Sequence, residues 1–191
     1  MIITNYISKN IPHLNENDTI KKVIQLEADF RLTHLPVVRK GKLVGNLNLE
    51  ISRSLNEEEI IKDHLVELEQ FYLYEKALIF DSLRVFSDNE TNILPVIDVK
   101  GKFLGSVLEE DVVEEFADSP FIKEYGVYMT VTTPIKKYSI SEIANIVESN
   151  NGRILGLMLV NTDEETAQIT LKINAENISS IGDTFERFGY Q

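Results

Sequence analysis

The feature that most constrains this chain is an internal repeat with a period of about 60 residues. It is carried by HLPVVRKGKLVGNLNLEI (residues 34–51) and ILPVIDVKGKFLGSVLEEDV (residues 93–112). Pro36 and Pro95 are 59 positions apart, whereas Gly41 and Gly101 are 60 apart, so the later turn contains one inserted residue. A chain that repeats itself at a fixed period folds as similar supersecondary units that bury their apolar faces on one another.

Each copy of the repeat has the pattern of a β-hairpin with helices on either side. Two short β-branched runs flank a Lys-Gly-Lys turn, which predicts a hairpin. Apolar residues at helical spacing precede the hairpin, as at Ile79, Leu83 and Phe86 in the second copy. We therefore predict an α+β protein built on two repeats of βαββα type.

The repeat also sets the predicted domain organisation. We expect repeat one over residues 1–55, an acidic connector helix over 56–71, and repeat two over 72–118. The proline at position 120 follows a short acidic helix and marks a predicted boundary, so a further domain covers 119–191.

Residues 119–191 are predicted to have the order β-α-β-β-α of a ferredoxin-like unit. Ser139 and Glu142 form a capping box before the first helix of this part. The chain stops where the fourth strand of a split βαβ fold would begin, which would leave one sheet edge bare. We therefore expect a unit that lacks its fourth strand or borrows one from a partner.

Composition excludes several classes of function. The chain has 31 acidic and 19 basic side chains, and this net charge of −12 repels nucleic acids and anionic membranes. It has no cysteine, and its histidines, His13, His34 and His64, are far apart without metal-ligand spacing. We expect a cytoplasmic protein without nucleic-acid or membrane partners, without a metal or bound cofactor, and without catalytic activity.

The duplicated segments resemble the two halves of a tandem cystathionine-beta-synthase (CBS) domain pair, which would cover residues 1–118. The tail is similar to an ACT-type regulatory domain in its order of elements. The resemblance implies that the two repeats pack as one pseudo-twofold module and form homodimers. It also implies that adenosine-containing ligands bind in the clefts between the repeats.

The resemblance further implies where such a ligand would bind. After the second strand of each repeat, the family places a hydroxyl residue and, three positions later, a carboxylate. The first copy has Asn48 and Ile51 at these positions, so we predict that its site is lost. The second copy has Leu108 and Asp111, and we predict that Asp111 holds the ribose.

Other residues are predicted to complete the second-copy site. Thr91 and Asn92 would line the entry of the neighbouring strand, and Lys100 or Lys102 would offset phosphate charge. Tyr74 is a candidate for stacking on an adenine base, although packing in the core of a strand is the favoured alternative for this tyrosine.

These observations lead to two functional hypotheses. The first is a non-catalytic regulatory module that senses an adenine nucleotide or a related metabolite in the second-copy cleft. The alternative is a ligand-independent dimerisation and protein-interaction scaffold whose CBS sites have decayed. The second hypothesis explains Asn48, Ile51 and Leu108 directly.

Overall fold

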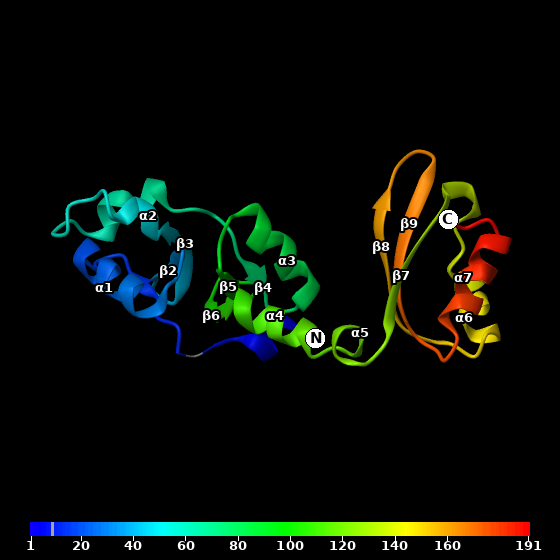
Figure 1. Ribbon diagram of the computed structural model, residues 1–191. Helices are drawn as coiled ribbons and strands as arrows, with labels where there is room; N and C mark the ends of the chain where they lie inside the picture. Colours follow the sequence, from blue (N-terminus) through cyan, green and yellow to red (C-terminus); the bar gives the residue numbers. More distant parts are fainter. Residues whose placement is uncertain (9) are drawn as a thin grey trace. The chain divides into compact units, whose positions relative to one another are not determined.

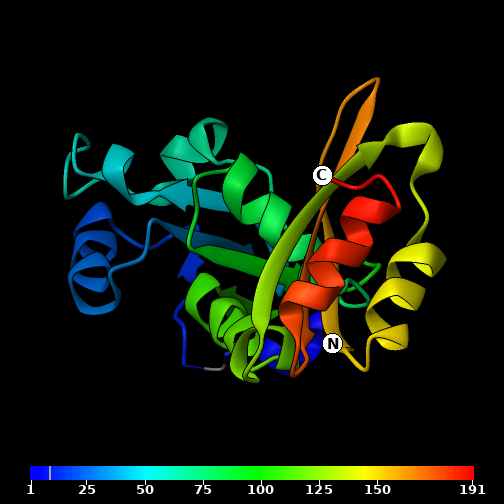
Figure 2. The same ribbon diagram turned by 45° about the vertical axis from the view of Figure 1, so that its right-hand side comes forward.

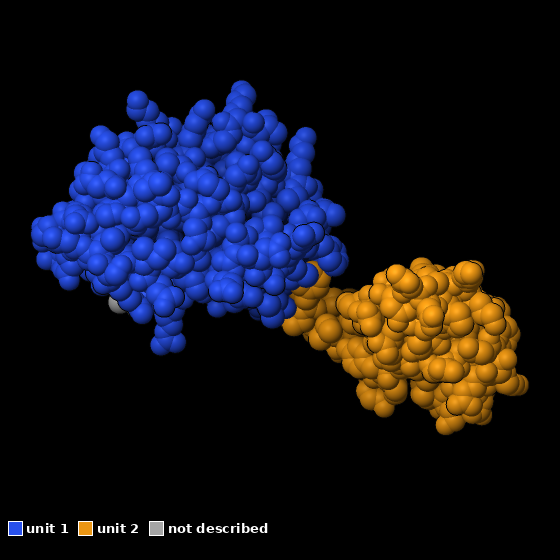
Figure 3. All heavy atoms as spheres, turned by 90° about the horizontal axis from the view of Figure 1, so that it is seen from above, with its two compact units in different colours: residues 1–115 blue, residues 116–191 orange. Residues whose placement is uncertain are grey.

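The computed structural model describes residues 1–8 and 10–191 and confirms the α+β class (Figure 1). The chain divides into two compact units, which Figure 3 shows in different colours: unit 1 covers residues 1–115 and unit 2 covers residues 116–191. This division falls inside helix α4 (Glu109–Ala117).

Unit 1 contains two similar halves, each preceded by a leading segment with a 3-10 helix. The first half follows η1 (Ile3–Tyr6) and holds β1 (Leu14–Asn15), α1 (Ile20–Phe30), β2 (His34–Arg39), β3 (Lys42–Asn48) and α2 (Leu49–Ser52). The second half follows η2 (Ile61–Glu67) and holds β4 (Leu73–Tyr74), α3 (Ile79–Asp88), β5 (Ile93–Ile97), β6 (Phe103–Leu108) and α4. In each half a short strand pairs in parallel with the first strand of an antiparallel hairpin, which confirms the βαββα order.

The two hairpin turns differ by the inserted residue that the repeat predicts. In the first turn, Lys40 and Gly41 have φ values of 50° and 76°, the positive values that a two-residue type I′ turn requires. In the longer second turn, the carboxylate of Asp98 accepts the backbone N–H groups of Lys100 and Lys102, each at 2.8 Å.

Reciprocal hydrogen bonds join equivalent positions of the two halves. The Thr33 N–H donates to Asn92 Oδ1 at 2.9 Å, and the Asn92 N–H donates to Thr33 Oγ1 at 3.1 Å. At the turns, the Phe103 N–H donates to the Gly41 carbonyl at 3.0 Å, and the equivalent bond runs from Leu43 to Gly101 at 3.3 Å. Because each bond is matched by its counterpart, the halves are related by a pseudo-twofold axis.

The segment that was expected to be a connector helix is instead the leading segment of the second half. Residues 60–71 contain η2, which is 3-10 rather than α-helical and is interrupted by a non-helical His64. This segment is equivalent to residues 1–8: the Ile61 N–H donates to the Asp18 carbonyl, and the Ile3 N–H donates to the Ala77 carbonyl. The second repeat therefore begins near residue 60 rather than at residue 72.

The two leading segments are exchanged, so that each packs on the half that it does not precede. Residues 60–71 contribute the buried Ile61 and Leu68 to the core of the first half. Residues 1–8 reach the second half, where the Ser8 N–H donates to the Ser106 carbonyl at 2.9 Å. The repeated glycines make room for this crossing, because a Cβ on Gly45 would lie 2.8 Å from the Cβ of Leu68. On Gly105, the equivalent atom would collide with the side chain of Ile7.

Unit 2 is a three-stranded antiparallel sheet with two helices on one face (Figure 2). Its elements are α5 (Pro120–Lys123), β7 (Val127–Pro134), η3 (Ile135–Lys137), α6 (Ile140–Ser149), β8 (Arg153–Thr162), β9 (Thr166–Asn174) and α7 (Ile178–Arg187). The strand order is β7-β9-β8, and the core lies between the sheet and α6 and α7. Ser139 caps α6 by accepting the Glu142 N–H, as its sequence position predicts.

The last residue of the chain lies where a fourth strand of this sheet would run. Gln191 and Thr132 exchange two backbone hydrogen bonds, at 2.7 and 2.9 Å, on the outer edge of β7. The neighbouring Tyr190 is buried, and its hydroxyl donates to Glu142 Oε2 at 2.8 Å. The edge that was expected to be bare is therefore paired at Thr132.

The opposite face of this sheet carries the short helix α5. The ring of Phe121 lies directly over Gly156, where the absence of a side chain leaves room for it. The buried ammonium group of Lys172 donates to the Ile122 carbonyl at 2.8 Å and lies 4.8 Å from the ring centroid of Tyr128. These contacts attach the segment before β7 to the sheet of unit 2.

Candidate functional site

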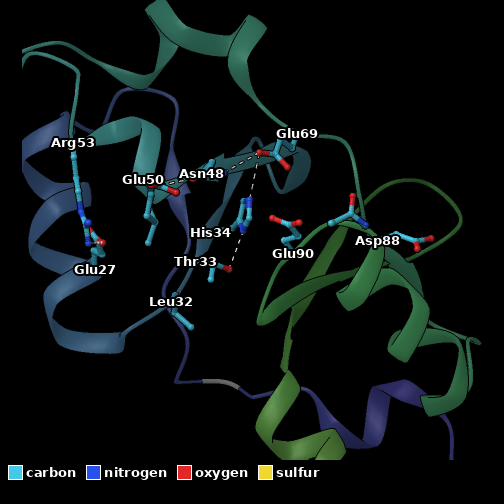
Figure 4. Close-up of a pocket in the computed structure, with 12 residues that line it drawn as sticks. Glu27, Leu32, Thr33, His34, Asn48, Glu50, Arg53, Glu69, Asp88 and Glu90 are labelled. Carbon is cyan, nitrogen blue, oxygen red and sulfur yellow. Dashed lines mark hydrogen bonds and ion pairs between the residues drawn. The ribbon is translucent and has the colours of Figure 1, made fainter.

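A cleft of about 540 Å³ lies in unit 1 and is lined by both halves (Figure 4). The residues that line it are Glu27, Leu32, Thr33, His34, Asn48, Leu49, Glu50, Arg53, Glu69, Asp88, Asn89 and Glu90. Its volume falls within the range of small-molecule binding sites. We call it the His34 cleft.

The local folding of each half brings these residues together. Thr33 and His34 lead into β2, and Asn48 ends β3 and caps α2 by accepting the Glu50 N–H at 3.0 Å. On the other side, Glu90 follows α3 with a left-handed φ of 47°. Glu69 reaches the cleft because its leading segment is exchanged: its backbone forms two hydrogen bonds with that of Asn46, each at 2.9 Å.

His34 is the most buried polar residue of the cleft, with 2% of its surface exposed. Its Nδ1 lies 2.9 Å from Thr33 Oγ1, and its ring meets Phe71 edge-on with centroids 5.2 Å apart. Its Nε2 lies 3.4 Å from Glu69 Oε1 but has no hydrogen-bond partner. Burial lowers the pKa of His34, and the nearby Glu69 carboxylate opposes this shift only in part.

The remaining charges make the His34 cleft acidic. Five carboxylates line it, from Glu27, Glu50, Glu69, Asp88 and Glu90. Among the described lining residues, the one arginine is Arg53, whose Nε and Nη2 groups both donate to the Glu27 carboxylate. The field inside the cleft is therefore negative, which favours cations and disfavours phosphate groups.

The structure divides the predicted site residues between two places. Thr91 and Asn92 line a second cleft of about 340 Å³, together with Glu109. Their polar groups are already engaged, because the Thr91 hydroxyl donates to the Ile93 carbonyl at 3.0 Å and the Asn92 amide donates to the Arg31 carbonyl at 3.1 Å. Asp111 is half-buried in the first turn of α4, near Glu109.

The other three predicted residues lie at the opposite end of the hairpin. Lys100 and Lys102 belong to the turn after β5, and Tyr74 pairs with Ile97 at the same end of that strand. The length of β5, roughly 16 Å for a five-residue strand, separates this end from Asn92. The structure therefore does not bring these three residues together with Asn92, and their role in ligand binding stays a prediction.

The packing of Tyr74 in the core of a strand, the favoured alternative, is also corrected. Tyr72 and Tyr74 are 38% and 50% exposed and pack edge-on against each other at 5.4 Å. The neighbouring Phe71 and Leu73 point into the core instead. Alternation along an extended segment places successive side chains on opposite faces, and here the tyrosines take the outer face.

The family pattern assigned the ligand to the second copy, whereas the His34 cleft lies beside the first-copy strands β2 and β3. One signal for a polar cleft at the first copy was present in the sequence. His34 occupies the position that the apolar Ile93 takes in the second half. No signal in the spacing placed Glu69 beside it.

Two kinds of feature are absent from the described part of the chain. Within residues 1–8 and 10–191, no helix is long and apolar enough to cross a membrane. The same residues contain no group of three or more histidine, cysteine or acidic side chains arranged to hold a metal ion.

Solved structures that resemble this chain contain CBS domains. A CBS domain pair/ACT domain protein from Thermotoga maritima has a TM-score of 0.56 and 22% identity, and the match covers 62% of this chain and 98% of that one. The CBS domains of a transcriptional regulator from Streptococcus pneumoniae have a TM-score of 0.53 and 18% identity, covering 60% and 98% of the two chains. At these identities the likeness shows the fold.

Curated relatives match over a similar stretch. A homoserine O-acetyltransferase of Methanococcus vannielii is 32% identical over 117 residues, which are 58% of this chain and 24% of that protein. An uncharacterized protein of Methanocaldococcus jannaschii is 22% identical over 107 residues, covering 56% and 36%. The chain thus spans less than half the length of these relatives.

The CBS domain family itself matches residues 3–50 and 59–118. The second match begins just before η2, in agreement with the assignment of residues 60–71 to the second repeat. The match covers more than half of the chain and includes both halves of unit 1, and the chain therefore belongs to the CBS domain family.

Proposed function

We propose that this chain is a regulatory module that binds a small molecule between its two CBS repeats. The observation that carries the proposal is the His34 cleft, to which the first half contributes His34 and Asn48 and the second half contributes Asp88 and Glu90. An adenine nucleotide or a related adenosine-containing metabolite is the ligand class that the CBS resemblance implies.

A ligand in such a cleft acts by differential affinity. It contacts both halves of unit 1, so it stabilises the arrangement of the halves that fits it best, and it shifts the equilibrium only by the difference in affinity. We propose that unit 2 is an ACT-like domain that responds to this change and that the chain acts as a homodimer. Its cytoplasmic location and its lack of nucleic-acid partners also stay predictions.

A thermal-shift screen of the whole chain tests the proposal. AMP, ADP, ATP, S-adenosylmethionine and free amino acids are added separately, and a ligand at a hundredfold its dissociation constant contributes about 2.7 kcal/mol of stability. Asn48→Leu places in the His34 cleft the residue found in the second repeat, and Asp111→Ala tests the carboxylate that the CBS resemblance assigns to the ribose. The proposal is refuted if none of these compounds raises the unfolding midpoint.

The scaffold hypothesis remains the second candidate because of one observation. Thr91 and Asn92 use their polar groups to hold the two halves together, which leaves the second cleft few free donors or acceptors. Light scattering, combined with the thermal-shift screen, distinguishes a ligand sensor from a scaffold. A stable dimer that responds to no ligand supports the scaffold, whereas a ligand-induced shift lost in Asn48→Leu supports the sensor.

A further inference from the structure

We propose that the His34 cleft recognises a positively charged amino group of its ligand, which donates hydrogen bonds to His34 Nε2 and to the Glu69 carboxylate. This inference rests on the proposed function, because it assumes that the cleft binds a small molecule. The inference adds the chemical group of the ligand that the His34 cleft selects. It also distinguishes the His34 cleft from the cleft that Thr91 and Asn92 line.

The hydrogen bonds around Thr33 favour one tautomer of His34. Thr33 Oγ1 accepts the Asn92 N–H at 3.1 Å. Besides His34 Nδ1 at 2.9 Å, the Thr33 hydroxyl has two acceptors within reach, Asn92 Oδ1 at 3.1 Å and Thr91 Oγ1 at 3.2 Å. We therefore assign the ring proton to Nδ1, which donates to Thr33 Oγ1, and the free lone pair of the neutral ring to Nε2.

This bare acceptor faces a second acceptor. Nε2 of His34 lies 3.4 Å from Glu69 Oε1, and it is a buried atom without a hydrogen-bond partner. A buried polar atom without a partner is costly, and two lone pairs facing each other add repulsion. Burial lowers the pKa of His34, so the ring does not readily take a proton from solvent to relieve this arrangement. A ligand donor that reaches both atoms would satisfy them together.

The charges around this pair favour a cationic donor. Glu50, Asp88 and Glu90 also line the cleft, whereas Arg53 is engaged by Glu27. An ammonium group has three N–H donors, enough for Nε2, the Glu69 carboxylate and one further acceptor. A phosphate group would meet the same carboxylates with repulsion.

The second repeat lacks this pair of acceptors. Ile93 stands at the position of His34, and Leu108 stands at the position of Asn48, whose amide donates to Glu69 Oε1 at 3.2 Å. The preference for an amino group is therefore a property of the first-repeat cleft alone.

Three adenosine derivatives that differ only at the 5′ position test the inference on the full chain. The probes are 5′-amino-5′-deoxyadenosine, adenosine and AMP, whose 5′ groups are cationic, neutral and anionic, and binding is measured by isothermal titration calorimetry. We expect the amine to bind roughly 10- to 100-fold more tightly than adenosine, because a charge-assisted hydrogen bond forms, and AMP to bind most weakly.

Two variants and one control test whether His34 and Glu69 cause the preference for the amine over adenosine. Glu69→Gln removes the charge and keeps the shape, and His34→Ile introduces the residue that the second repeat carries at this position. Both should reduce the preference for the amine over adenosine to less than threefold, whereas Glu114→Gln, an exposed position outside the cleft, should keep it. Circular dichroism checks that each variant is folded, and Glu69→Gln alone suffices if His34→Ile is not.

The possible failures are distinguishable. If AMP binds as tightly as the amine, the inference is wrong and the proposed ligand-binding function stands. A preference for the amine that survives in Glu69→Gln also overturns the inference. If none of the three probes binds, the proposed adenosine-binding function is wrong, and the inference is overturned with it.

Discussion

The exchange of leading segments predicts where a core mutation will act. Ile3 precedes the first half in the chain, yet its N–H donates to Ala77 of the second half, and its side chain is fully buried. Ile3→Ala removes three carbon groups, a loss of roughly 2.4 kcal/mol from transfer alone. With the cavity left behind, we expect unit 1 to lose about 3 kcal/mol, within the usual range for such substitutions.

Ile61→Ala is the matched variant. Ile61 is also fully buried, but it precedes the second half and packs in the core of the first. Its loss should cost a similar amount of stability. The two variants therefore remove equivalent side chains on opposite sides of the pseudo-twofold axis and differ in the half that they loosen.

Hydrogen exchange measured by mass spectrometry shows which half of unit 1 each variant loosens. About 3 kcal/mol corresponds to a rise of roughly 100-fold in the population of open states. Ile3→Ala should expose the amides of Ser8 and Ile79, which bond to Ser106 and Met1, before those of the first half. Ile61→Ala should act first on the amides of Ile20 and Asn46.

The opposite pattern would refute the exchange. If Ile3→Ala loosened the first half more than the second, or if both variants acted on the half that they precede, the crossing of residues 1–8 and 60–71 would be wrong. Tyrosine fluorescence in urea gives the total loss of stability as an independent measurement.

Four further outcomes are expected. Lys40→Asn should stabilise unit 1 by about 0.5–1 kcal/mol in urea unfolding, because asparagine tolerates the left-handed backbone, whereas Lys100→Asn in the longer turn should not. Gly156→Ala should displace the ring above it, cost about 1–3 kcal/mol and speed proteolysis between residues 116 and 126; unchanged digestion would contradict the packing of α5. Burial lowers the pKa of His34, so unit 1 should lose stability as the pH falls from about 6.5 through that lowered value, and His34→Ile should flatten this dependence. Burial lowers the pKa of His64, but the hydrogen bonds to Glu67 and Glu59 outweigh it, so the net pKa is raised. Protonated His64 should therefore stabilise unit 1 below about pH 6.5, and this stabilisation should be lost as the pH rises through the raised pKa. If His64→Asn leaves the dependence of unfolding free energy on pH unchanged, His64 has no such role.

Local patterns were sufficient wherever a short stretch of chain decides the outcome. The offset between the two copies predicted the longer second turn, where Asp98 now accepts two backbone N–H groups. The capping box at Ser139 predicted the start of α6. Both features depend on residues a few positions apart, and such contacts are encoded by spacing.

The His34 cleft could not be predicted from the sequence because the residues that line it are far apart in the chain. The family pattern points to Asp111, three positions after the second strand of the second repeat, whereas the His34 cleft lies at the first repeat. Glu69 was expected in a connector helix, and an acidic residue on such a helix has no special partner. Lys100 was grouped with Asp111 from chemistry alone, although a full strand separates the turn from the cleft.

The sequence by itself determined that the chain folds as a duplicated α+β module, because the repeat, the hairpin turns and the helix patterns are local signals. Only the tertiary structure decided that the leading segments cross over and that Glu69 meets His34 in an acidic cleft. The physical reason is that these contacts depend on which surfaces the two halves bury against each other. Packing across the pseudo-twofold axis determines these surfaces, and the spacing of residues within a motif does not encode them.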